Sequence, residues 1–319
     1  MKCDLVCPKN AKTFVARIRE VGGLDLNDVG RAPATAISDL PQVVPLVYHG
    51  FRRTADLSAT AIAVPLEKMF SHRTGEAKFR DHAELSQRFR TAQNAKLVVF
   101  GVAIDQPLED YWSIARARHI QRSLAELRPA LVSTPNFSLF NDVPRWDNLH
   151  SMKRIALCWF ELANTGIPTA LHVNARTERD WQSWGEFLKR HTEIGIVSYE
   201  FKTGAATAAR GNWHARHISR LPELAERPLR LIVRGGSRHL RQFARSFSAV
   251  AFVSPDPFIR AMKRRRLVWR WPQKPRWIRE KTDPGQSLDD LLQHNVALYS
   301  AMVLRRSFGH VDSAGVDVG

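Results

Sequence analysis

The sequence predicts an α/β fold, a (β/α)8 TIM-like barrel with an N-terminal cap and a basic helical C-terminal tail. Eight short apolar runs recur along the chain, and most are separated by one stretch of helical periodicity. The clearest unit, residues 230–266, has the order strand, glycine turn, helix and strand, which requires parallel strands. An open doubly wound sheet fits the same local signals and stays open as the alternative.

The eight predicted strands differ in how clearly the sequence marks them. The run KLVVFGVAI (96–104) is continuous and ends on Asp105, whereas the run at 61–66 is interrupted by Pro65. The strands are expected to begin near residues 43, 61, 97, 130, 168, 194, 230 and 250.

Helical periodicity fills most of the intervals between these strands. We expect Asp147 to cap one helix, which ends at the Asn-Thr-Gly of residues 164–166. The expected helices cover residues 79–92, 112–127, 147–164, 178–190, 213–220, 240–247, 258–266 and 288–304.

Three parts are expected along the chain. Residues 1–40 contain a helical period that ends at Gly22 and Gly23, and we interpret them as a cap across the barrel. Residues 41–266 form the barrel. Residues 267–319 form an extension that is basic and rich in tryptophan.

The charge balance favours a polyanionic partner. The 319 residues include 48 Lys and Arg against 31 Asp and Glu, a net charge of +17. A generally arginine-rich proteome would give the same total, but clustering argues against it. Between Arg260 and Lys281 there are ten basic residues and one acidic residue, Glu280. Nucleic acid is therefore the expected partner.

No run of eighteen apolar residues and no signal-peptide pattern occurs, so we expect no membrane partner and a cytoplasmic protein. Three cysteines do not make a disulfide framework. Cys3 and Cys7 lack a second pair at zinc-finger spacing, and Cys158 is expected to be a buried apolar residue. We expect no metal and no cofactor.

Polar residues follow the strands where a barrel places its active site. Asp256 lies between two prolines, which stiffen its backbone and suit a nucleophile or general base; the alternative is a helix N-cap. Glu200 and Asp105 are further candidate catalytic carboxylates, although Asp105 also fits a turn before Pro107. His172 lies inside a strand and is expected to be packed.

A phosphate site is expected after the seventh strand. Gly235, Gly236, Ser237 and Arg238 lie at a helix N-terminus, where free N–H groups and the helix dipole favour an anion. The alternative is that the two glycines only make a tight turn.

A basic and aromatic stretch follows the last strand and is suited to neutralise phosphates and stack on bases. Alternatively, its tryptophans dock the tail onto the barrel. The expected nucleic-acid-binding residues are Arg260, Lys263, Arg264, Arg265, Arg266, Trp269, Arg270, Trp271, Lys274 and Arg276.

Two segments resemble known families. Residues 134–142, TPNFSLFND, followed by Pro144, resemble the loop of a family of phage and plasmid proteins with the motif S-P-D-F-S-x-Y, although Asn136 stands where that family has Asp. The 230–266 unit is similar to the last βαβ segment of the tRNA-guanine transglycosylase superfamily, which includes enzymes that exchange guanine for a deazaguanine base in DNA.

The second resemblance implies that Asp256 is the nucleophile, and it favours DNA over tRNA as the partner. The zinc-binding cysteine cluster of the tRNA enzymes is missing here, a departure that zinc-free relatives tolerate. The superfamily's S-G-G-F substrate loop has no clear counterpart unless TPNFSLF replaces it. The residues expected to bind the base are Asn136, Phe137, Ser138, Asn174 and Arg234.

Three functions follow as hypotheses. The first is a transglycosylase that exchanges guanine for a deazaguanine base in DNA through a covalent intermediate on Asp256. The second is a non-catalytic basic DNA-binding protein of phage or plasmid replication. The third is a barrel enzyme for a small phosphorylated metabolite.

Overall fold

The computed structural model describes residues 11–202, 207–283 and 285–309. Eight parallel strands pair in the order β1-β8-β7-β6-β5-β4-β3-β2. The two outermost strands also meet, because the Val47 N–H donates to the Ala63 carbonyl at 2.9 Å. The sheet therefore forms a nearly closed barrel, as predicted, and is not open and doubly wound. The strands are β1 (Val43–Pro45), β2 (Ala61–Pro65), β3 (Lys96–Phe100), β4 (Leu131–Ser133), β5 (Thr169–His172), β6 (Ile196–Glu200), β7 (Arg230–Arg234) and β8 (Ala249–Ser254).

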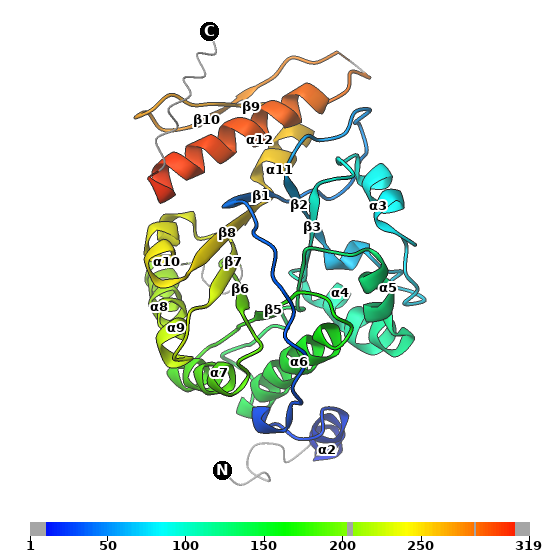
Figure 1. Cartoon of the computed structure of the whole chain (residues 1–319), viewed down its shortest axis with the longest axis vertical. Coiled ribbons are helices and arrows are strands. Elements are labelled where there is room, and N and C mark those ends of the chain that lie inside the picture. The colour runs from blue at the N-terminus through cyan, green and yellow to red at the C-terminus, as the bar shows by residue number, and fades with distance from the viewer. Residues whose placement is uncertain (1–10, 203–206, 284, 310–319) are drawn as a thin grey trace.

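Helices surround this barrel as a ring (Figure 1). They are α2 (Ala11–Glu20), α3 (His82–Phe89), α4 (Asp105–Asp110), α5 (Ile120–Glu126), α6 (Arg145–Ala163), α7 (Glu178–Arg190), α8 (Ala208–Ser219), α9 (Leu221–Leu224), α10 (Leu240–Ser246), α11 (Asp256–Met262) and α12 (Asp289–Val303). Short helical turns are η1 (Leu26–Asp28), η2 (Leu66–Lys68), η3 (Tyr111–Ala115), η4 (Arg116–Arg118), η5 (Ser237–His239) and η6 (Leu304–Phe308).

Two apolar clusters form because side chains alternate along each strand. One cluster lies between the strands and the helices. The other fills the barrel interior, where small alanines such as Ala63 and Ala170 leave room for Phe100. The barrel is therefore a packed core and not a pore.

Residues between α2 and β1 cross the amino end of the barrel, where the cap was expected (Figure 1). Ile37 packs against the inner cluster, and its carbonyl accepts from the Arg230 guanidinium at 2.9 Å. The Lys96 ammonium donates to the Asp39 carbonyl at 2.6 Å. Because Arg230 and Lys96 begin β7 and β3, these contacts close the end of the barrel opposite the candidate site.

Three predicted helices differ from the structure. The helix expected over 258–266 ends at Met262, because Arg265 and Arg266 belong to a strand that pairs with residues 276–279. The expected helix over 112–127 is broken at His119, whose φ of 56° is left-handed. The break lets both halves face the core, since Trp112 before it and Leu124 after it are buried. The helix expected to be capped by Asp147 begins at Arg145 instead, and the Asp147 carboxylate pairs with Arg17 of α2.

The last helix, α12, completes the helical ring. The helix directly after β8, α11, has seven residues, and α12 packs beside it and β1. Leu291, Leu292 and Val296 of α12 belong to the same buried cluster as the barrel helices. The apolar core is thus continuous across the boundary predicted at residue 267.

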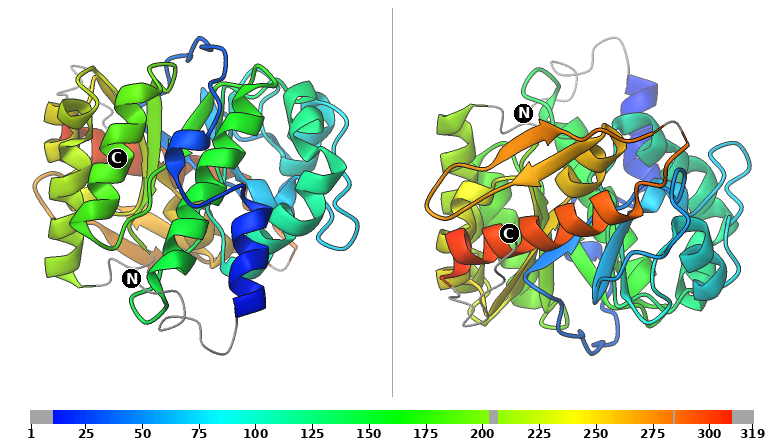
Figure 2. Two further views of the ribbon diagram at one scale, coloured as in Figure 1. Left: turned by 90° about the horizontal axis from the view of Figure 1, so that it is seen from below. Right: turned by 90° about the horizontal axis from the view of Figure 1, so that it is seen from above.

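The basic residues of the extension lie largely outside α12, in an antiparallel hairpin of β9 (Arg265–Val268) and β10 (Arg276–Arg279). Hairpin and helix lie side by side (Figure 2). Asn295 of α12 fixes the hairpin, because its side chain accepts from the Leu267 N–H and donates to the Arg265 carbonyl, each at 2.8 Å. Asn295 is fully buried.

Asn295→Ala should lower the free energy of unfolding by about 1–3 kcal/mol, because it leaves buried main-chain groups of β9 unpaired. Urea unfolding followed by tryptophan fluorescence measures the loss. Ser300→Ala on the same helix is the control, and a loss for Asn295→Ala no larger than that of the control would contradict this role.

Candidate active site at the carboxyl end of the barrel

The ends of four neighbouring strands bring a polar cluster together. Glu200 and Arg234 are direct partners in the register of β6 and β7, and the Glu200 Oε2 lies 3.3 Å from the Arg234 Nε. The Arg234 Nη2 donates to the hydroxyl of Tyr48, just beyond β1, at 3.2 Å. A carboxylate, a guanidinium and a phenol thus meet at the carboxyl face, where barrel enzymes carry their sites.

Glu200 is the buried acid of this cluster. Its side chain is 2% exposed, and one oxygen, Oε1, accepts from the Lys202 N–H. Burial raises the pKa of Glu200, and the nearby positive charge of Arg234 opposes this in part. Among the described residues, Oε2 has no hydrogen-bond partner. Glu200 is therefore placed to hold and release a proton.

Asp256 is the exposed acid of the cluster. Pro255 holds the cap position of α11 and Asp256 is its first residue, so Asp256 is not the N-cap. Its carboxylate is 45% exposed and lies 3.8 Å from the Lys202 ammonium. The Tyr299 hydroxyl of α12 donates to it at 3.4 Å. Burial raises the pKa of Tyr299 to about 12, so the phenol keeps its proton.

Lys202 connects the two acids, because its N–H contacts Glu200 and its ammonium faces Asp256. One carboxyl is buried with a raised pKa, and the other is open to solvent. Two carboxyl groups in such different surroundings can take separate roles, the buried one in proton transfer and the exposed one in nucleophilic attack. Lys202, Tyr48 and Tyr299 were not predicted as site residues. Lys202 follows Glu200 closely enough to be found from sequence, whereas Tyr299 reaches the site from a distant helix.

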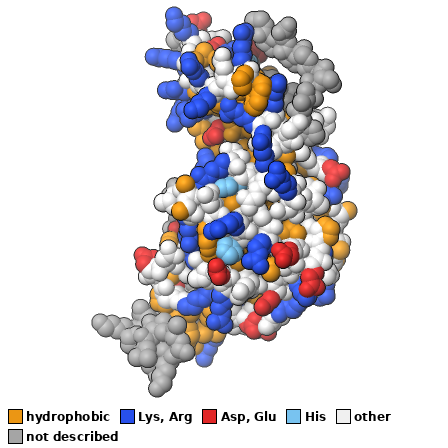
Figure 3. Space-filling model, turned by 90° about the vertical axis from the view of Figure 1, so that its left-hand side faces the viewer, with side chains coloured by type: hydrophobic (Ala, Val, Ile, Leu, Met, Phe, Trp, Pro, Cys, Tyr) orange, Lys and Arg blue, Asp and Glu red, His pale blue; other side chains and the backbone are white. Residues whose placement is uncertain are grey.

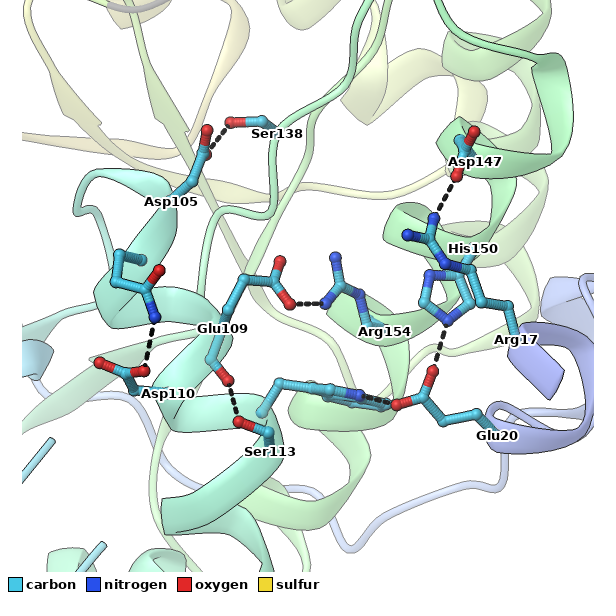
Figure 4. Close-up of polar contacts among 12 residues, drawn as sticks. Arg17, Glu20, Asp105, Glu109, Asp110, Ser113, Ser138, Asp147, His150 and Arg154 are labelled. Atoms are coloured by element: carbon cyan, nitrogen blue, oxygen red, sulfur yellow. Dashed lines mark hydrogen bonds and ion pairs between the residues drawn. The ribbon is translucent and has the colours of Figure 1, made fainter. Parts of the chain in front are cut away.

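Asp105 belongs to a separate group of contacts. It begins α4, and its carboxylate accepts from the Ser138 hydroxyl at 2.5 Å (Figure 4). The Asn136 side chain accepts from the Ala103 N–H at 3.3 Å. These contacts hold the 134–140 loop against the end of β3, so Asp105 and Glu200 occupy two different groups.

The remaining predicted base-binding residues also support that loop. The Asn174 amide donates to the Phe137 carbonyl at 3.0 Å. Phe137 is 1% exposed, and the Arg154 guanidinium lies 4.0 Å from its ring centroid. In this structure Phe137 is a packing residue, Ser138 is half-buried, and Phe140 is the exposed end of the loop.

Arg154 of α6 lies beside the polar contacts by which Glu20 joins α2 to the barrel (Figure 4). It pairs with Glu109 at 2.6 Å. Nearby, Glu20 of α2 accepts from the Trp112 indole at 2.5 Å and contacts the His150 ring at 3.0 Å. These contacts fix α2 on the outside of the barrel.

The predicted phosphate turn has left-handed glycines, with φ of 72° at Gly235 and 64° at Gly236. A Cβ at Gly236 would lie 2.6 Å from the Phe201 ring, so the turn needs glycine for close approach as well. Ser237 begins the short turn η5. Arg238 points away to α8, where it donates to the Ala208 carbonyl at 3.2 Å.

The predicted nucleic-acid-binding residues gather on α11 and the hairpin. Blue side chains crowd this end of the molecule, with apolar side chains among them (Figure 3). Ile278 and Trp271 are large exposed apolar residues of this surface. Its exposed charged residues are Lys263, Arg265, Arg270, Lys274, Arg276 and Arg279.

Other residues of the stretch have structural contacts. Arg266 pairs with Glu280 at 3.0 Å, and Arg264 donates to the Thr282 carbonyl at 2.9 Å. The Arg260 guanidinium lies 5.6 Å from the Trp277 ring centroid. The Trp269 indole donates to the Gln273 carbonyl at 3.1 Å. Some tryptophans therefore dock the hairpin while Trp271 stays open.

A second basic region was not predicted. A cavity of about 1030 Å³ opens beside Tyr48, between the loop after β1 and the end of α3. The repeated arginines of Phe51-Arg52-Arg53 and Arg88-Phe89-Arg90 were the sequence signal for it.

Cys3 and Cys7 lie outside the described residues, and Cys158 is buried with its pKa raised by burial. Within the described ranges no group of His, Cys, Asp and Glu has the arrangement of a metal site. In the same ranges, no helix has the length and apolar character that a membrane crossing needs.

Comparison with models of known protein families and with curated protein sequences finds no match.

The buried Glu200 should make stability depend on pH. Its pKa is raised above 4.5 in the folded protein and returns to its usual value on unfolding. The stabilising contribution of the protonated form is complete below about pH 4.5 and is lost as the pH rises through the folded pKa. Glu200→Gln has no such titration.

The stability of the wild type relative to Glu200→Gln should therefore fall between about pH 4.5 and the folded pKa, and then level off. Urea unfolding of both proteins across this range measures the difference. A difference that stays constant with pH would contradict a raised pKa.

Proposed function

We propose that this protein is a barrel enzyme that modifies nucleic acid by exchanging a purine base, with Asp256 as the nucleophile and Glu200 as the acid and base. The observation that carries the proposal is the pairing of an exposed Asp256 with a buried Glu200 around Lys202. The choice of guanine and a deazaguanine base, and of DNA over tRNA, rests on the resemblance of residues 230–266 to the transglycosylase superfamily.

The reaction is a double displacement at the sugar. An Asp256 oxygen attacks C1′ of the nucleotide and forms an ester as the bond from C1′ to N9 of guanine breaks. Glu200 gives its proton to the departing base. The incoming base then loses its N9 proton to Glu200 and attacks C1′, which releases the Asp256 carboxylate. One base replaces another, and both carboxyl groups return to their initial states.

Neighbouring residues have supporting roles. The Lys202 ammonium lies 3.8 Å from the Asp256 carboxylate and can hold it in position for the attack. The Arg234 guanidinium lies beside Glu200 and would stabilise it once its proton has left. Asp105 bonds Ser138 in the other group of contacts, so we assign it to support of the substrate loop and not to proton transfer.

A second candidate is a non-catalytic DNA-binding protein. The exposed arginines of the hairpin, together with Trp271 and Ile278, favour it, because they form a basic and apolar surface. In that case Glu200 and Asp256 have only structural roles.

Asp256→Asn should reduce base exchange by at least about 10³-fold, because the amide cannot form the ester. Glu200→Gln should cost about 10²–10⁴-fold. Exchange is measured as incorporation of labelled guanine into DNA and into tRNA, followed by digestion and mass spectrometry of the nucleosides. Asp28→Asn, at an exposed position of η1 on the amino side of the barrel, is the matched control and should keep near wild-type exchange.

DNA binding is measured on the same proteins. Wild-type exchange that is lost in Asp256→Asn while binding is kept supports the enzyme. Binding without exchange in the wild type, unchanged in Asp256→Asn, identifies the DNA-binding protein instead.

A further inference from the structure

The unassigned cavity beside Tyr48 is an open groove on the carboxyl side of the barrel, with a volume of about 1030 Å³. Its walls come from the loop after β1, the turn after β2 and the last turn of α3. Six of its lining residues are Lys or Arg, against one acidic residue, Glu84. The basic residues are Arg52, Arg53, Lys68, Lys78, Arg88 and Arg90.

The groove is held in a fixed shape. Arg53 is buried, and its guanidinium donates to the carbonyls of His49, Phe89 and Arg90, so it joins the β1 loop to the end of α3. A Cβ at Gly50 would lie 2.5 Å from the Arg88 carbonyl, so the two backbones are in direct contact. A preorganised groove loses little freedom when a ligand binds.

Two of the lining arginines adopt an unfavourable backbone conformation. Arg52 has a φ of 63° and Arg90 a φ of 52°, the left-handed region that side chains with a Cβ disfavour. Strain of this kind is concentrated at ligand-binding sites. The side chains of Arg52, Lys78 and Arg88 are exposed, so their charges are open to an anion.

The positive charges act on each other. Burial first, and then the charges of Arg53, Lys68 and Arg52, lower the pKa of His49. Burial and the charge of Lys68 lower the pKa of Lys78. These neighbouring positive charges give the groove a positive electrostatic potential, which a chain of phosphates would neutralise.

A largely exposed aromatic ring lines the groove. Phe51 is 70% exposed, and the Arg52 guanidinium lies 5.4 Å from its ring centroid. An exposed ring among basic side chains is the arrangement that stacks on an unpaired base while the cations contact the backbone. A paired base in a duplex does not offer its face in this way.

Tyr48 connects the groove with the candidate active site, since it lines the groove and its hydroxyl accepts from Arg234. We propose that the groove binds a single strand of the nucleic-acid substrate, with Lys78, Arg88 and Arg52 on its phosphates and Phe51 stacked on a base. This deepens the proposed function and rests on it for the nature of the substrate.

The test measures binding separately from base exchange. Fluorescence anisotropy gives the Kd of a labelled oligo-dT of about 15 nucleotides for each protein at several salt concentrations. Lys78→Glu combined with Arg88→Glu should weaken binding at least about tenfold and reduce the salt slope by about 0.7 for each phosphate that the variant no longer neutralises. The matched control is Arg118→Glu combined with Arg122→Glu, two exposed residues that do not line the groove, with the same charge change.

Phe51 separates stacking from charge. Phe51→Ala should weaken binding about tenfold with no change in the salt slope, and Phe51→Trp should restore it. Circular dichroism and thermal unfolding confirm that each variant is folded. A duplex of the same length should bind the wild type more weakly than oligo-dT does and should be little affected by Phe51→Ala.

Three results would overturn the proposal. They are equal losses for the groove and control variants, a groove effect that is the same for duplex and single strand, and competition by free pyrophosphate as strong as by oligo-dT. The last result would identify a small-anion site. If the groove variants lose oligo-dT binding but the wild type exchanges no base, the groove proposal holds and the proposed reaction fails.

Discussion

The contact between the two outermost strands is the constraint on which the site depends. The bond from Val47 to Ala63 brings β1 next to β2, after β1 has already paired with β8. The curved sheet lets Arg234, at the end of β7, reach across β8 to Tyr48 beyond β1. The contact between β1 and β2 places the loop after β1 beside the turn after β2, and both line the groove. The same curvature brings the basic groove and the two carboxylates to one end of the barrel.

The pair formed by Glu200 and Arg234 carries a large desolvation free energy, because both charged groups are largely buried. Removing both charges from water costs more than their attraction in many proteins, so a buried ion pair is weak evidence for a stabilising role. The raised pKa of Glu200 is the sign that this cost has not been fully offset. A site that must move a proton has a reason to keep such a group, whereas a packed core does not.

Much of the fold could be predicted from sequence because local pattern determines it. All eight strands lie where the apolar runs place them, and His172 is packed as expected, 2% exposed. The break at His119 was not predicted, because it depends on tertiary packing. Both halves of that segment bury side chains in the core. Asp147 has the features of a cap, but a partner 130 residues away, Arg17, determines its contact.

The site residues also fall into two groups, those that local sequence predicts and those that only the folded structure reveals. Glu200, Arg234 and Asp256 follow strands, so a barrel places them together whatever the loops do. Asp105 also follows a strand, but Ser138 holds its carboxylate, and only three-dimensional contacts show this. Tyr299 and the groove combine segments far apart in the chain, such as residues 51–53 and 88–90, which no spacing rule connects.

The position of α12 has a consequence for how the protein is made. Strand β1, near the start of the chain, can pair with β8 only after β8 has been synthesised. Likewise, Asp256 can bond Tyr299 only after the last long helix has been synthesised. During synthesis the amino-terminal parts of a chain emerge first and begin to fold. A growing chain therefore exposes the edge of β1 through most of translation, and its two acids gain their full surroundings only after α12 has left the ribosome.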